Sequence, residues 1–185
     1  MFRLRRPDDA ELTRIAAEQH RNDVTYPEVG ATAGPDLPAG YAHDRATVVL
    51  GSGQAVFDRA VAALRDWQPQ RGSDFSVAAT GPIAEGVTVA LGTRLPLVYA
   101  VVAGRVVYVE DDADRFAFAY GTLPLHPEQG EERFAVERSG DEVTFGVVAF
   151  SRLANPVLRI ATPVARLLQA RAAQGYLDAM TRAVG

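Results

Sequence analysis

Hydrophobic and polar residues alternate along the middle of this chain, whereas towards both ends the hydrophobic residues recur every three or four positions. A period of two is typical of half-buried strands, and a period near 3.6 is typical of amphipathic helices. The strand-like runs are residues 42–50, 86–91, 97–103, 105–110, 115–121, 131–138 and 142–151. Connections such as Ala103–Gly104 and Ser139–Asp141 are too short for crossovers, so we predict that the last six runs form an antiparallel meander.

Three segments carry a helical stripe. The stripes are Leu12, Ile15, Ala16 and Gln19 within residues 7–21; Phe57, Ala60, Val61, Leu64 and Trp67 after the turn Gly51–Gly53; and Val157, Ile160, Ala161, Val164, Leu168, Ala172, Tyr176 and Met180 near the C-terminus. In the last helix Asn155 is the expected cap with Pro156 in the first turn, and Pro163 should kink the helix or mark its true start. Residues 22–41 contain so many Pro and Gly residues that we expect a long loop there.

The order strand, helix, six strands and long helix predicts an α+β fold, in which the last helix lies across one face of a curved seven-stranded antiparallel sheet. One helix about 10 Å wide cannot fill the concave side of such a sheet, so we expect a cavity beneath it. We predict a single domain over residues 1–185, with an N-terminal helix and loop (1–41), the sheet with one inserted helix (42–152) and the C-terminal helix (155–184).

The amino-acid composition excludes chemistry that depends on cysteine or lysine. The chain of 185 residues has no Cys, and all 19 of its basic residues are Arg. Disulfides, thiolate zinc sites, a Lys Schiff base and a P-loop lysine are therefore excluded. The net charge of −4, with arginines scattered among 23 acids, argues against a nucleic-acid partner. We find neither a membrane-spanning segment nor a secretory signal, and we expect a soluble cytoplasmic protein whose oligomeric state the sequence leaves open.

Metal and cofactor sites are not expected either. The three histidines form no H-x-x-x-H or E-x-x-H spacing. Gly51–Gly53 superficially resembles a dinucleotide loop, but the strands that follow are joined by hairpins rather than by helices, so we interpret it as a helix start.

Three segments point to a known family. Residues 26–32 (YPEVGAT), 40–45 (GYAHDR) and especially 118–134 (FAYGTLPLHPEQGEERF) resemble the uncharacterised bacterial and plant family DUF1990, also called UPF0548. That family is similar to the helix-grip superfamily, also called START/Bet v 1-like or SRPBCC. The resemblance implies the same fold as the element order does, and a cavity for sterols, lipids, hormones or polyketides, which some members cyclise or dehydrate. It implies no activity for this family.

Two residues of the third segment are candidates for acid/base chemistry. Strand parity places Glu132 on the face of Phe118, Tyr120 and Phe134, where a desolvated carboxyl group would have a raised pKa. The plain alternative is that Glu132 reaches solvent or pairs with an arginine. His126 lies in a loop stiffened by two prolines and could transfer protons, or it could simply be a turn histidine that hydrogen-bonds a backbone carbonyl.

The leading hypothesis is a protein that binds a small, hydrophobic or amphipathic molecule. Its candidate ligand-binding residues are Tyr26, Tyr41, His43, Phe118, Tyr120 and Phe134, with Glu132 and His126 adding polar contacts. The rival is a cyclase, dehydratase or hydrolase of the same fold, with Glu132 or His126 as general acid/base and residues 22–41 as a lid. An interaction module that uses the sheet edge or the long helix is a third possibility.

Overall fold

The computed structural model describes residues 1–95, 97–155 and 162–185, without the side chains of residues 162–165 and 168. Its elements are β1 (Phe2–Arg3), α1 (Asp9–Gln19), η1 (Ala31–Ala33), β2 (Ala42–Ser52), α2 (Gln54–Arg65), α3 (Gln68–Arg71), β3 (Ser76–Ala79), β4 (Thr88–Arg94), β5 (Tyr99–Asp112), β6 (Arg115–Thr122), β7 (Glu128–Ser139), β8 (Glu142–Leu153) and α4 (Thr162–Val184). Of the predicted start of the last helix, only Asn155 lies within the described residues. Pro156 and the stripe residues Val157, Ile160 and Ala161 lie outside them.

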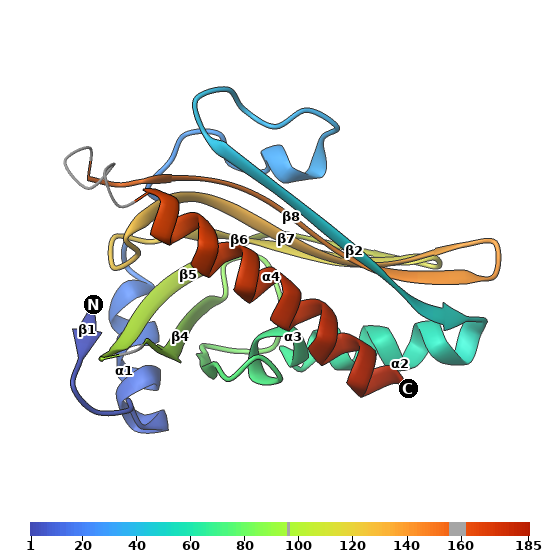
Figure 1. Cartoon of the computed structure of the whole chain (residues 1–185), viewed down its shortest axis with the longest axis horizontal. Coiled ribbons are helices and arrows are strands. Elements are labelled where there is room, and N and C mark those ends of the chain that lie inside the picture. Colours follow the sequence, from blue (N-terminus) through green and yellow to red (C-terminus); the bar gives the residue numbers. More distant parts are fainter. Residues whose placement is uncertain (96, 156–161) are drawn as a thin grey trace.

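The strands form one antiparallel sheet in the order β2-β8-β7-β6-β5-β4-β3, and β1 pairs with β5. The first long strand, β2, therefore lies beside the last strand, β8, so that the chain closes on itself before α4 crosses the sheet (Figure 1). The predicted α+β architecture, with a curved antiparallel sheet and a long C-terminal helix, is confirmed. Helix α4 begins at Thr162, which places Pro163 in its first turn.

Two strand predictions were wrong in detail. Residues 97–103 and 105–110 are parts of a single strand, β5, with no turn at Gly104. Gly104 makes room for an aromatic ring, because a Cβ there would lie 3.0 Å from Cδ2 of Tyr120 on the neighbouring strand. The seventh main strand is instead the short edge strand β3, in a segment outside the predicted strand-like runs.

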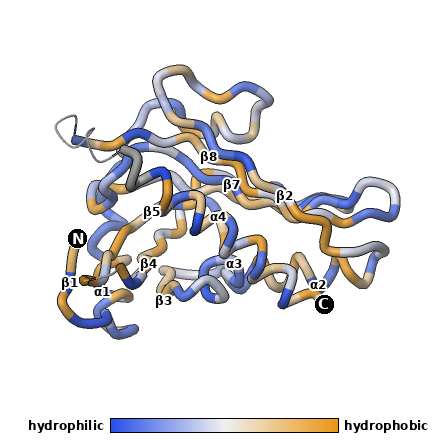
Figure 2. The backbone as a smooth tube through the Cα atoms, in the orientation of Figure 1, coloured by the Kyte–Doolittle hydropathy of each residue, from blue (hydrophilic) through white to orange (hydrophobic). Residues whose placement is uncertain are grey.

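The sheet separates two sets of helices and loops. On its concave face α2, α3 and α4 cover an aromatic core that includes Phe118, Phe134 and Phe145. On the opposite, convex face α1 packs Leu12 and Ile15 against β4 and β5, and η1 contacts β7 and β8. Figure 1 shows α4 and the segment around η1 on opposite sides of the strands. In Figure 2 the central strands carry many of the hydrophobic stretches, whereas the turn between β7 and β8 is mostly hydrophilic.

Candidate functional site

The concave face of the sheet changes from apolar to polar along the strands. Phe118 pairs with Phe134 and Phe134 pairs with Val147, which makes one wholly apolar row across β6, β7 and β8. Two residues further along, the next row on this face consists of Tyr120, Glu132, Ala149 and Asp44. Because every second residue of a strand shares a face, both rows point towards α4. The concave face is therefore amphipathic.

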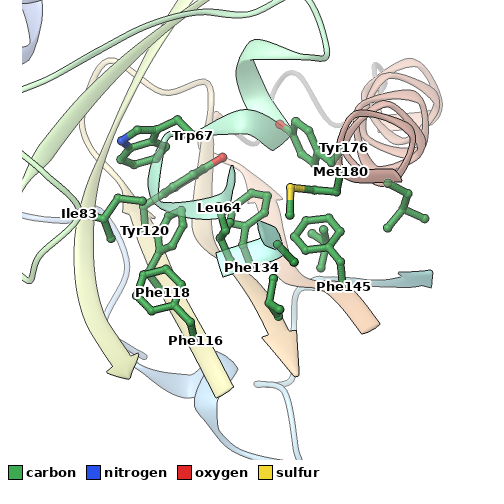
Figure 3. Packing of buried hydrophobic residues seen from close by; sticks show 14 of the residues in the cluster. Leu64, Trp67, Ile83, Phe116, Phe118, Tyr120, Phe134, Phe145, Tyr176 and Met180 are labelled. Atoms are coloured by element: carbon green, nitrogen blue, oxygen red, sulfur yellow. The ribbon is translucent and has the colours of Figure 1, made fainter. Parts of the chain in front are cut away.

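Aromatic rings surround the inner end of the polar row. The ring centroid of Trp67 lies 5.0 Å from that of Phe118 in an edge-on contact and 6.3 Å from that of Tyr120 in a stacked one. The Phe134 ring lies 5.4 Å from the ring of Tyr176 on α4. Figure 3 shows that the oxygen-bearing ends of Tyr120 and Tyr176 point into the space between Trp67, α3 and α4. Two phenol groups thus enter an otherwise apolar environment.

The hydrogen bonds in this cluster are few and short. Tyr120 Oη donates to Glu132 Oε2 at 2.5 Å, and Tyr176 lies close enough to interact with the same tyrosine hydroxyl. Gln70 of α3 is fully buried and lies near Tyr120, yet within the described residues neither atom of its amide makes a hydrogen bond of normal geometry. A buried polar group without a partner costs about 1–3 kcal/mol, so a molecule that supplied a partner to Gln70 would be favoured there.

Burial also changes the acidity of these groups. The pKa of Glu132 is raised to about 7, chiefly by desolvation and further by the nearby carboxylates of Glu128 and Asp44, although the bond from Tyr120 opposes the shift. Desolvation likewise raises the pKa values of Tyr120 and Tyr176 well above the ordinary value for tyrosine. Near neutral pH Glu132 is therefore divided between its neutral and charged forms, which suits a group that exchanges protons.

The polar row continues into a set of contacts with α4. Arg166 bonds Asp44 at 3.1 Å, and Gln169 donates both to Glu128 at 2.9 Å and to Ser151 at 2.7 Å. Burial raises the pKa of Glu128, and Asp44 raises it further. These contacts tie the N-terminal half of the helix to β2, β7 and β8. They also leave three carboxylates facing one guanidinium among the described residues here.

The ring of His126 bonds the backbone of its own turn, but through an N–H group and not through the carbonyl that was expected. Its Nδ1 accepts a hydrogen bond from the backbone N–H of Glu128 at 3.1 Å, and the backbone N–H of His126 donates to the carbonyl of Leu123 at 2.8 Å. Burial lowers the pKa of His126 to about 4, so the imidazole is neutral at physiological pH. These contacts are typical of a histidine that holds a turn together.

The remaining predicted binding residues lie on the other side of the sheet. The rings of Tyr26 and Tyr41 both pack edge-on against Phe150 on the convex face. Tyr41 donates its hydroxyl to Glu28 at 2.6 Å, and His43 Nε2 donates to the carbonyl of Pro38 at 2.8 Å. The structure thus brings Phe118, Tyr120, Glu132 and Phe134 together and separates Tyr26, Tyr41 and His43 from them by the thickness of the sheet.

Glu131, the neighbour of Glu132, lies on the convex face of the sheet. Strand parity does turn it away from Glu132, but it is buried rather than solvated. Its Oε2 accepts from Tyr26 Oη at 2.6 Å and from the backbone N–H of Gly30 at 2.7 Å, and its Oε1 accepts from the N–H and the hydroxyl of Thr32. The loop before β2 is therefore held on the convex face, away from α4, and it does not form a lid over the concave face.

This geometry can be compared with known proteins. The family model "Domain of unknown function (DUF1990)" matches residues 25–179. The chain belongs to the DUF1990 family. A UPF0548 protein of Deinococcus radiodurans is 36% identical, and the match covers 100% of both chains. The two DUF1990 segments around Tyr26 and Glu131, which are far apart in sequence, meet in the bonds just described.

Solved structures share the fold at low sequence identity. A hypothetical protein from Helicobacter pylori aligns with a TM-score of 0.58 at 15% identity, over 89% of this chain and 97% of its own. The Zhui aromatase/cyclase from a Streptomyces species aligns with a TM-score of 0.57 at 12% identity, over 78% and 93% respectively. This DUF1990 protein therefore has a START/Bet v 1-like, helix-grip fold. None of its described helices is both long and apolar enough to cross a bilayer.

Proposed function

We propose that this protein binds a small amphipathic molecule between the concave face of the sheet and α4. The apolar body of the ligand packs on the aromatic row of Phe118 and Phe134, and its polar end reaches the row of Tyr120 and Glu132. The cavity that this requires remains a prediction of the fold. The observation that carries the proposal is the buried amide of Gln70, which makes no hydrogen bond of normal geometry among the described residues and lies near Tyr120 of the polar row.

Native mass spectrometry of the purified protein tests this proposal directly. We expect a bound small molecule, seen as a mass difference between native and denatured protein. The variant Gln70→Leu should lose the ligand but remain folded, since it removes an unsatisfied buried amide. Gln174→Leu makes the same chemical change on the exposed face of α4 and should keep the ligand. Equal ligand retention by the two variants would contradict the placement of the site, and the absence of any ligand from the protein and from metabolite extracts would contradict binding.

A second function, catalysis at the same site, is supported by the raised pKa of Glu132 and by its short bond from Tyr120. Glu132 would act there as general acid or base, and a protein with the same fold is named an aromatase/cyclase. Once a ligand is known, the turnover rate at saturating ligand distinguishes the two functions. An enzyme should lose about 10²-fold or more in kcat when Glu132 is replaced by Gln, whereas a pure binding protein shows no turnover to lose.

A further inference from the structure

The polar row places two carboxylates on either side of a small residue. Asp44 and Glu132 both pair with Ala149, one from β2 and the other from β7, so that only a methyl group stands between them on this face. Adjacent strands lie about 4.8 Å apart, which separates the backbones of the two acids by roughly 10 Å. A third carboxylate, Glu128, lies four residues from Glu132 on the same strand and interacts with both other acids.

The charges in this region do not balance. Glu132 interacts with Asp44 from β2, Tyr120 from β6, Glu128 from β7 and Tyr176 from α4. Around them, Gln70 from α3 lies near Tyr120, and Arg166 and Gln169 from α4 bond Asp44 and Glu128. Arg166 is the single cationic side chain among these described groups, and its guanidinium bonds Asp44. Tyr120 gives Glu132 a hydrogen bond but no positive charge. A partly desolvated carboxylate in such surroundings is neutralised either by a proton or by a cation.

Two further observations favour an organic cation. The buried amide of Gln70 has no hydrogen-bond partner among the described residues, and its oxygen can accept a bond from an N–H group. Tyr120, with which this amide interacts, stacks on Trp67 at a ring-centroid distance of 6.3 Å, and aromatic rings attract ammonium and guanidinium groups. Within the described residues no three His, Asp or Glu side chains are arranged to hold a metal ion. Acidic, amide and aromatic groups are the combination that a substituted amine requires.

We infer that the polar end of the ligand is a cationic nitrogen, an ammonium or guanidinium, which pairs with Glu132 beside Tyr120 and Gln70 while its apolar body packs on the aromatic row. This inference rests on the proposed function and adds the charge of the ligand to it. Binding of the cation stabilises the charged form of Glu132, so that a proton is released when a ligand binds near neutral pH.

Three probes of matched shape test the charge: 4-phenylbutylamine, 4-phenylbutanol and 4-phenylbutyrate, titrated into the full-length protein by calorimetry at pH 7. We expect the amine to bind about tenfold or more tightly than the alcohol, and the carboxylate to bind most weakly. Amine binding should also release protons, which appear as a dependence of the measured heat on the buffer. The variant Glu132→Gln should reduce the amine preference to near unity and abolish proton release, whereas Glu142→Gln, at an exposed position, should change neither.

The outcomes separate this inference from the function on which it rests. Equal affinities for the three probes, or tightest binding of the carboxylate, would overturn the cationic head group and leave the binding of an amphipathic molecule intact. An amine preference that survives in Glu132→Gln would overturn the assigned position of the charge. If none of the probes binds at millimolar concentration, both the inference and the proposed site are contradicted. Circular dichroism of each variant ensures that loss of binding is not loss of folding.

Discussion

The substitution Glu131→Gln is predicted to weaken the fold although it changes neither the size nor the shape of the side chain. Glu131 accepts four hydrogen bonds from Tyr26, Gly30 and Thr32, two at each oxygen. A glutamine keeps one acceptor oxygen and turns an NH2 group towards the other pair of donors. The hydroxyls of Tyr26 and Thr32 can rotate and accept from that group, but a backbone N–H cannot.

The magnitude follows from counting what loses its acceptor. In either orientation of the amide one backbone N–H, that of Gly30 or of Thr32, faces the NH2 group, and an unsatisfied buried donor costs about 1–3 kcal/mol. The bonds that remain lose their charge, which roughly halves their strength. We therefore expect a loss of about 2–3 kcal/mol of unfolding free energy, which lowers Tm by roughly 4–12 °C in a chain of this size. The free energy needed to detach the loop from the convex face sets an upper limit to this loss.

Urea unfolding, followed by far-UV circular dichroism and by the fluorescence of the single tryptophan, measures this loss. Glu137→Gln is the matched control, because Glu137 lies on the same strand and the same face but forms partly exposed ion pairs with Arg115 and Arg133. Its loss should stay below about 1 kcal/mol. Limited proteolysis should cut residues 22–41 faster in Glu131→Gln than in the control. A variant within about 0.5 kcal/mol of wild type, or equal losses in the two variants, would refute the role assigned to Glu131.

Three other measurements test the structure. Burial raises the pKa of Glu132 from 4.5 to about 7, so the folded state binds this proton more tightly than the unfolded state, and stability must fall as the pH rises through this window. Allowing for partial exposure, wild type should lose about 1–2 kcal/mol of unfolding free energy relative to Glu132→Gln between pH 5 and pH 8. A constant difference between the two proteins would contradict the shift. Burial lowers the pKa of His126 to about 4, so the NMR chemical shifts of its imidazole nitrogens should not change between pH 5.5 and pH 8. A titration midpoint near pH 6.5 would disprove its burial as a neutral group. Gly130→Ala should cost about 3 kcal/mol or more in urea unfolding, because the new Cβ overlaps the carbonyl oxygen of Phe150. Gly140→Ala should cost only about 1–2 kcal/mol for its φ of 61°, since its Cβ meets nothing within 4 Å. Similar losses in the two variants would show that the backbone of β8 can shift at Phe150.

Periodicity predicted the architecture well because burial on one face imposes it. The alternating runs and the long C-terminal stripe yielded the meander and the covering helix, and Tyr176 and Met180 of that stripe are buried in the core. The same signal failed at Gly104, where a glycine inside a strand was interpreted as a turn. Glycine permits a turn but does not require one, and here it accommodates the ring of Tyr120.

The candidate site was predicted in part. Parity placed Glu132 with Phe118, Tyr120 and Phe134, and the structure has them on one face. Gln70 was missed because it lies in a four-residue helix with no usable periodicity, and its importance comes only from what surrounds it. Tyr26 and Tyr41 of the loop, and His43 at the start of the strand that follows it, were assigned to the same pocket. They lie on the other face, which was not predicted because a sequence does not show which side of a sheet a loop will cover.

The amino-acid sequence by itself determined the order of the elements, the direction in which each strand side chain points, and the absence of cysteine and lysine chemistry. These properties are local, since alternation and helical spacing act within one element. Which surface covers each face of the sheet was decided only by the tertiary structure. Glu131 and Glu132 are neighbours with opposite orientations, yet one is saturated by a loop about 100 residues earlier and the other faces a helix that begins 30 residues later. Burial and pKa depend on those distant partners, so the chemistry of the two carboxylates appears only when the chain is folded.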